Sequence, residues 1–349
     1  MEVIKKRLIW ADVLRIIAIY LVIVVHTSSL SKSPFNLTIA WPFILSFAFA
    51  KTCVPLFVML SGALLLGKTE TYQVFFKKRV RKVLIPWIVW TLIYMFWNYN
   101  FNHYAASTIS QWKYFFELTF LSQLWFLPLI FSLYLITPLL RLMTIKFKTA
   151  DSRYLLLLWF IWVSALPFLH PSPAFPGGSA AGLLALAVYY SGYFYLGFVL
   201  TKSKFAEEKI MFSVGVTAIG IVTTLIEIFL IKNITLYPSV VFDYFAPGIV
   251  ITSIGLFLLI SHLFTKTISI KSNKLNSVII LLSSASLGIY IVHSLFLQIF
   301  DVYLQKYFLV NFVALPILEI YLHALIIFIL SFGFVYLLKK LPLIRQIVP

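Results

Sequence analysis

Long runs of apolar residues, separated by short polar segments, dominate this chain. A helix needs about 20 mostly apolar residues to cross the hydrocarbon core of a membrane. Ten runs are long enough, and we predict that each is a transmembrane helix: residues 8–30, 40–66, 83–100, 122–142, 154–170, 182–200, 210–231, 243–264, 277–299 and 315–338. The second run is unusually long and contains Pro55, so we expect it to be kinked or tilted.

The composition indicates a polytopic membrane protein. Of the 349 residues, 62% are hydrophobic and 11% are charged, whereas soluble domains are usually about 45–50% apolar and about 25% charged. We therefore predict an all-α membrane helix bundle that forms a single integral membrane domain over residues 1–349, with no fused soluble domain. The single cysteine, Cys53, excludes an internal disulfide and a cysteine-rich metal site.

The positions of lysine and arginine predict how the helices are oriented, because cytoplasmic segments of membrane proteins are rich in these residues. With the N-terminus inside, nearly all of the 28 basic residues fall in inner segments. The exceptions are Lys32, Lys113, Lys232 and Lys306 in outer segments, and Arg15 and Lys51 within spans. Both termini are therefore predicted to be cytoplasmic. The same distribution accounts for the net charge of +17, so no nucleic-acid partner is expected.

The first span, Arg7–Leu30, carries three ionisable residues, Asp12, Arg15 and His26. Such groups are costly inside a membrane helix unless they are paired or face a polar cavity, so they mark a candidate functional site. Arg15 and His26 are three helical turns apart, on nearly the same face and about 16 Å apart along the axis. Asp12 precedes Arg15 by three residues and is expected to pair with it.

The predicted orientation brings further ionisable residues to the outer half of the bundle. These residues are His26, His293, Glu227, Asp243, Glu319 and His323. A histidine in a membrane helix can also serve only as an interhelical hydrogen-bonding group. We favour a functional role for His26 and His293, and a structural role for Glu227, Glu319 and His323.

Two other segments each allow two interpretations. The basic run Lys77–Lys82 can anchor the inner side of the bundle, or it can bind a phosphorylated cytoplasmic molecule. The aromatic segment Gln111–Leu127 can belong to the membrane interface or form a platform for carbohydrate. The chain has no nucleophile elbow, zinc-protease motif, P-loop or dinucleotide fingerprint. An enzyme would therefore use intramembrane residues and a diffusible donor, without a metal.

Five segments in family order carry a resemblance to a known family. They are the Arg-x10-His pattern from Arg15 to His26, the stretch Val54–Leu66, the basic run Lys77–Lys82 before Pro86, the segment Leu124–Arg141, and the Tyr-x-x-His pattern of Tyr290 and His293. The chain resembles the bacterial membrane-bound acyltransferase 3 family over nearly its whole length. Within it, the chain is similar to the stand-alone type, such as the enterobacterial common antigen O-acetyltransferase.

The resemblance implies transfer of an acyl group, most often acetyl from acetyl-CoA, to a hydroxyl of a surface carbohydrate. It implies that Arg15 and His26 are essential, and we add Asp12 as the partner of Arg15. The donor side is assigned to Lys78, Arg79, Arg81, Lys82 and Arg15, and the acceptor side to Trp125, Tyr290, His293 and Glu319. The family often has two arginines spaced by two residues in the basic run, whereas Arg79 and Arg81 are spaced by one. The basic residue that contacts the donor therefore stays open.

In the expected mechanism, His26 is the general base that deprotonates a sugar hydroxyl. Tyr290 or His293 would stabilise the oxyanion or orient the acceptor. The expected partners are acyl-CoA, a carbohydrate that can be lipid-linked, and lipids of the bacterial cytoplasmic membrane. Two alternatives remain at this level: a transporter or flippase for a lipid-linked sugar, and a non-catalytic subunit of a polysaccharide export system. The acceptor, the acyl chain, the side of transfer and the oligomeric state stay open.

Overall fold

The computed structural model describes residues 7–29, 37–101, 123–169, 182–202, 210–233, 243–264, 273–303, 316–342 and 344–348. In these ranges the chain is helical and has no strand, which confirms the predicted fold class. Eight helical segments there are long and apolar enough to cross a membrane. The predicted sixth and eighth spans correspond to two further helices, α10 (Gly182–Lys202) and α13 (Pro247–His262).

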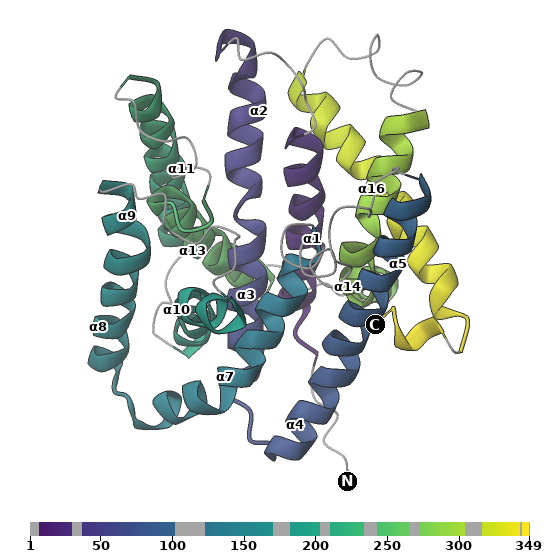
Figure 1. The fold of residues 1–349 in the computed structure, drawn as a ribbon. Coiled ribbons are helices and arrows are strands. Elements are labelled where there is room, and N and C mark those ends of the chain that lie inside the picture. The colour runs from purple at the N-terminus through teal and green to yellow at the C-terminus, as the bar shows by residue number, and fades with distance from the viewer. Residues whose placement is uncertain are drawn as a thin grey trace.

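The other helices follow the predicted runs in chain order (Figure 1). They are α1 (Ile9–Ser29), α2 (Leu37–Ala50), α3 (Cys53–Leu65), α4 (Tyr72–Arg79), α5 (Ile85–Phe101), α7 (Phe126–Lys146), α8 (Thr149–Phe160), α9 (Leu166–Leu169), α11 (Ile210–Asn233), α14 (Asn273–Tyr303) and α16 (Pro316–Lys339). Two π-helical turns, η1 (Val80–Leu84) and η3 (Ile161–Ala165), join α4 to α5 and α8 to α9, and η2 (Gln123–Trp125) and η6 (Ile344–Gln346) are 3₁₀ turns.

Helix α1 lies inside the bundle, where it packs against α2, α3, α13, α14 and α16. Leu14, Ile19 and Ile23 are fully buried on it. A helix that is apolar on most of its surface is stable only where other helices or lipid cover it. The first span is therefore a core helix, and its polar residues face other helices of the protein.

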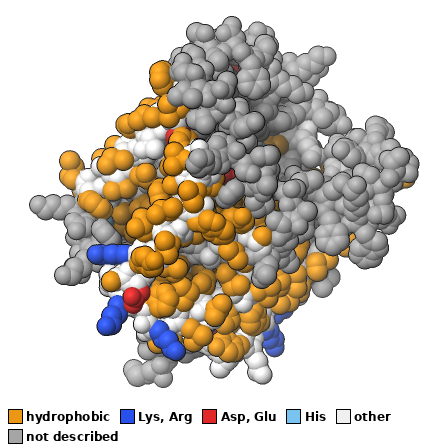
Figure 2. Space-filling model, turned by 60° about the vertical axis from the view of Figure 1, so that its left-hand side comes forward, with side chains coloured by type: hydrophobic (Ala, Val, Ile, Leu, Met, Phe, Trp, Pro, Cys, Tyr) orange, Lys and Arg blue, Asp and Glu red, His pale blue; other side chains and the backbone are white. Residues whose placement is uncertain are grey.

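The charges agree with the predicted topology. The N-terminal end of α1, α4 and the α7–α8 connection all lie toward the lower end in Figure 1. Figure 2 shows the face that carries α8 and α11, which is covered mostly by hydrophobic side chains, with Lys and Arg at its lower edge. Leu157 of α8, Trp162 of η3, and Ile219 and Phe229 of α11 are exposed there and suit contact with lipid tails. In the predicted topology, the lower end is the inner side.

The predicted second span is broken in the structure, and the break precedes the proline. Helix α2 ends at Ala50, Lys51 and Thr52 form a turn, and α3 begins at Cys53. Pro55 explains this position, because it has no N–H to bond to the carbonyl of Lys51 and its ring would clash with that carbonyl in a continuous helix. The break places Lys51 at the junction of α2 and α3, within the bundle.

The basic run was expected in a segment between spans, and the structure corrects this. Lys77–Arg79 lie at the end of α4, and Arg81 and Lys82 lie in η1. The third span begins at Tyr72 rather than at residue 83. Long basic side chains allow this extension, because their charged ends can reach the membrane surface from a helix.

Two glycines bring α3 and α10 unusually close. A Cβ atom added at Gly62 would overlap with the carbonyl of Phe194, and one added at Gly197 would overlap with the carbonyl of Met59. Small residues allow such backbone approach between membrane helices. The rigid contact fixes α3, and with it the helix break, against the rest of the bundle.

We predict that Gly62→Ala destabilises the protein by about 1–3 kcal/mol, the usual cost of adding a methyl group to a tightly packed core. Thermal unfolding in detergent measures the effect as a lower midpoint. Gly215→Ala is the matched control, since a Cβ there meets nothing within 4 Å among the described residues, and its midpoint should not fall. Equal midpoints for the two variants would contradict the tight contact.

Candidate functional site

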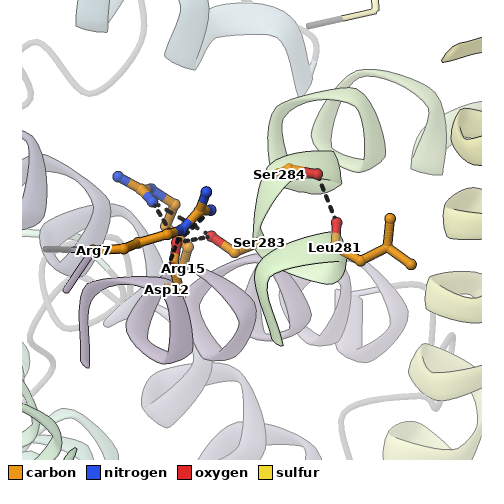
Figure 3. A network of polar contacts seen from close by, with 6 residues as sticks. All are labelled: Arg7, Asp12, Arg15, Leu281, Ser283 and Ser284. Carbon is orange, nitrogen blue, oxygen red and sulfur yellow. Dashed lines mark hydrogen bonds and ion pairs between the residues drawn. The ribbon is translucent and has the colours of Figure 1, made fainter. Parts of the chain in front are cut away.

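The inner end of α1 carries a network of charged and polar groups that joins it to α14 (Figure 3). The Asp12 carboxylate accepts hydrogen bonds from Arg7 (2.7 Å), from Arg15 (3.0 Å) and from the hydroxyl of Ser283 (2.6 Å). Asp12 is only 2% exposed, whereas the side chain of Arg15 is 31% exposed. The predicted Asp12–Arg15 pair is confirmed, and α14 supplies a further partner. Arg15 keeps an accessible side that a ligand could contact.

Further out, α1 and α14 bring two histidines together. The ring centroids of His26 and His293 are 5.1 Å apart. His293 is fully buried, and its Nδ1 lies 2.5 Å from the carbonyl oxygen of Tyr290. Because a carbonyl only accepts, Nδ1 donates, which leaves Nε2 as an acceptor. That Nε2 has no hydrogen-bonding partner among the described residues. The pair can therefore accept a proton or a hydrogen bond from a hydroxyl.

Tyr290 holds the start of α7 in place. Its hydroxyl donates to the carbonyl of Gln123 and accepts a hydrogen bond from the Phe126 N–H at 3.2 Å. Trp125 lies between these two residues and packs against Tyr190 and Tyr244, with ring centroids 6.0 and 5.4 Å away. The hydroxyl of Tyr290 is thus engaged with backbone, and Trp125 belongs to an aromatic cluster. Residues 111–122 of the predicted aromatic platform lie outside the described ranges.

The other predicted outer residues are dispersed. No contact between Glu319 and the histidine pair is found among the described residues, although the next residue, Ile320, accepts a hydrogen bond from Thr27 of α1. His323 packs against the ring of Phe300, 4.2 Å between centroids. Glu227 accepts a hydrogen bond from the Gly248 N–H (2.8 Å) and joins α11 to α13. Of the ionisable residues predicted to lie together in the outer half, His26 and His293 are in contact, whereas Glu227, Glu319 and His323 have other surroundings.

The basic run divides into two parts with different surroundings. Lys78 and Arg79 are paired with Glu70, at 3.1 and 3.6 Å, and Arg141 of α7 approaches the same carboxylate at 3.4 Å. Partial burial acts to raise the pKa of Glu70, but the hydrogen bond from Lys78 and the charge of Arg79 outweigh it, so this pKa is lowered. This part of the run ties α4 to α7.

Arg81 and Lys82 instead line a cavity of about 470 Å³ with Lys339, Arg345, Gln346 and Val348. Its described lining contains four basic side chains and no carboxylate. The C-terminal segment that forms part of its wall is held by a hydrogen bond from the Trp90 indole to the carbonyl of Ile347 (2.9 Å). A π-helical turn contributes two of the cations, and such turns often occur at functional sites. Four cations around one cavity suit the chemistry of a phosphorylated anion.

The cavity adjoins the inner network on α1. Lys339 donates a hydrogen bond to the carbonyl of Ser284 (2.7 Å), and the neighbouring Ser283 bonds to Asp12 and Arg15. On another side, Tyr134 of α7 lies within electrostatic range of both Arg15 and Arg79. The predicted donor residues are therefore grouped at the inner end of α1, and α1 and α14 lead from there to the histidine pair.

Sequence reasoning missed several of these residues. Lys339 and Arg345 were counted only as topology signals, and Glu70 and Arg141 were not singled out. Lys51 was noted only as a basic residue within a span. Its position four residues before a proline in an apolar run could have identified Lys51 as a candidate, because Pro55 breaks the helix there. Only the folded chain, however, shows what each of these residues contacts.

The sequence matches the family model described as an acyltransferase domain, that of acyltransferase 3, over residues 8–340. The chain belongs to this membrane acyltransferase family. No curated protein sequence and no solved structure matches it. Membership favours group transfer over the transporter and export-subunit alternatives. The matched range includes the histidine pair and the cavity residues Arg81, Lys82 and Lys339, whereas Arg345 lies beyond it.

We predict that Glu70 makes stability depend on acidic pH. A carboxylate with a lowered pKa in the folded state stabilises it above the ordinary glutamate pKa, and this contribution is lost as pH falls through the lowered value. Unfolding midpoints measured from pH 7 down to pH 3 should therefore fall more for the wild type than for Glu70→Gln. Parallel pH profiles for the two proteins would show that the cluster adds no such stability.

Proposed function

We propose that this protein is an acyl-CoA-dependent O-acyltransferase that moves an acyl group, most simply acetyl, to a hydroxyl of a carbohydrate. The observation that carries the proposal is the arrangement along α1 and α14. A cavity lined by four cations, with no carboxylate among its described lining residues, adjoins the inner end of these two helices, and a histidine pair lies further out on them. A donor with a phosphorylated head and a long thin arm fits this geometry.

The donor phosphates are assigned to Arg81, Lys82, Lys339 and Arg345, with Arg15 at the entrance to the helix pair. Guanidinium and ammonium groups recognise phosphate through charge-assisted hydrogen bonds. Lys78 and Arg79, which the sequence also suggested, are already paired with Glu70. We therefore assign them a structural role and narrow the donor site to the other half of the run.

His26 is assigned as the general base. It would take the proton of the acceptor hydroxyl as that oxygen attacks the thioester carbonyl, and it would return the proton to the leaving thiolate. His293 faces it, with its Nδ1 fixed by the carbonyl of Tyr290, and would orient the hydroxyl through Nε2. Asp12 holds Arg15 in place at the donor end.

The acceptor is proposed to approach past Trp125, Tyr190 and Tyr244, because aromatic rings present broad apolar faces with polar tips that suit sugars. A lipid-linked carbohydrate fits a site within the membrane. We place the protein in the bacterial cytoplasmic membrane, beside stand-alone members such as the enterobacterial common antigen O-acetyltransferase.

We predict that His26→Ala lowers acyl transfer about 10²- to 10⁴-fold, the usual contribution of a general base, while acyl-CoA still binds. Transfer of a labelled acetyl group from acetyl-CoA to extracted glycolipid, assayed with purified protein in detergent, measures the change. His262→Ala is the matched control, since His262 is another histidine in a membrane helix, but it is buried and bonds to Ser213 on α11. Wild-type turnover by His26→Ala would refute this role.

We predict that Arg81→Ala and Arg345→Ala each weaken acetyl-CoA binding about 10- to 100-fold, because each removes a charge-assisted contact worth about 1.5–3 kcal/mol. Equilibrium binding of labelled acetyl-CoA in detergent gives the dissociation constants. Lys146→Ala, at the exposed end of α7, should leave the constant unchanged. If all three variants bind as the wild type does, the cavity is not the donor site.

A further inference from the structure

The proposed reaction places negative charge where the residues assigned so far supply little compensation. Attack on a thioester moves an electron pair onto the carbonyl oxygen, and enzymes usually stabilise this oxyanion with a fixed donor. The hydroxyl of Tyr290 already donates to the carbonyl of Gln123. Arg15 lies about 16 Å from His26 along the helix axis. A cationic donor near His26 must therefore come from another element.

Lys51 occupies the required position. It lies in the turn between α2 and α3, and both of these helices pack against α1. The charges of His293 and Lys51 both act on the imidazole of His26. The Lys51 ammonium is thus a cation close to the proposed base.

The surroundings hold Lys51 without neutralising it. Its Nζ lies 4.3 Å from the ring centroid of Tyr244 and 4.9 Å from that of Phe47. Asp243 interacts with it at longer range, and no ion pair within 4.0 Å joins Lys51 to a carboxylate in the described ranges. Cation–π contacts position an ammonium group while leaving its N–H donors available. This differs from Lys78, whose ammonium bonds directly to Glu70.

Lys51 also adjoins the proposed acceptor path. Tyr244 contacts Lys51 on one side and Trp125 on the other, with ring centroids of the two aromatics 5.4 Å apart. The backbone carbonyl of Tyr244 is fixed by the hydroxyl of Tyr193, at 2.6 Å. The helix break, the aromatic cluster and the histidine pair therefore meet at one place in the bundle.

We propose that Lys51 is a catalytic residue whose ammonium group donates a hydrogen bond to the oxyanion formed on the acyl carbonyl. This inference rests on the proposed function. The acceptor oxygen forms a bond to the carbonyl carbon while His26 takes its proton, and the carbonyl π pair becomes the oxyanion that Lys51 stabilises. The carbonyl then re-forms, the carbon–sulfur bond breaks, and the proton on His26 passes to the departing thiolate. Lys51 keeps its proton throughout.

The test compares Lys51→Met and Lys51→Arg with the wild type, and uses Lys146→Met as a control for loss of a lysine elsewhere. Four quantities are measured on each purified protein: the dissociation constant for acetyl-CoA, kcat and KM for transfer to the glycolipid, the slow hydrolysis of acetyl-CoA without acceptor, and the unfolding midpoint. Hydrolysis passes through the same oxyanion but needs no carbohydrate, so it separates catalysis from acceptor binding.

We expect Lys51→Met to lower kcat about 10²- to 10³-fold, as loss of one oxyanion donor does elsewhere, and to lower hydrolysis in parallel. Acetyl-CoA binding should be unchanged, and Lys51→Arg should retain more activity than Lys51→Met. An unchanged kcat overturns the inference, and so does a raised acceptor KM with normal hydrolysis. Equal losses of activity and unfolding midpoint in both variants would show a structural role and also overturn it. A wild type that binds no acyl-CoA and transfers no acyl group would refute the proposed function itself.

Discussion

An ionised side chain within a hydrocarbon layer is stable only if the protein supplies its partners, and this constraint organises the inner half of the bundle. Asp12 is almost fully buried, and it accepts hydrogen bonds from Arg7, Arg15 and Ser283. Removing any one of these partners would leave a buried carboxylate incompletely compensated. The buried carboxylate on α1 therefore requires α14 beside it. Apolar contacts along the two helices stabilise the same pairing.

The same constraint distinguishes cations that hold the structure together from cations that can bind a ligand. Glu70 pairs with Lys78, Arg79 and Arg141. Among the described residues that line the cavity of Arg81, Lys82, Lys339 and Arg345, none is a carboxylate. Mutual repulsion of four neighbouring cations is unfavourable, and a bound anion would relieve it. Lys51 belongs to the second class, because aromatic rings hold it in place of a paired acid.

The sequence predicted the parts of this protein that depend on local pattern. Apolar runs predicted the helices, and the spacing of Asp12 and Arg15 predicted their ion pair. The Arg15–His26 and Tyr290–His293 patterns indicated the family. Sequence could not show that His26 faces His293, because that contact joins residues far apart in the chain. Nor could the sequence separate the residues of the run Lys77–Lys82 that pair with an acid from those that line the cavity. That separation depends on the position of Glu70, on the π-helical turn and on the C-terminal segment that packs beside it. The kink was expected near Pro55, but its consequence for Lys51 required the fold.

The two ends of the α1–α14 pair are fixed to each other, by Ser283 at the inner end and by the histidines further out. Helices are stiff along their axes, so the span from Arg15, at the end near the cationic cavity, to His26 has a set length of about 16 Å. In the proposed function, this fixed span selects donors in which the distance from the phosphates to the acyl carbonyl is long enough to reach His26. Acetyl phosphate carries the same acyl group and a phosphate but no extended arm. It could occupy the cavity and would still leave its carbonyl several helical turns from the base.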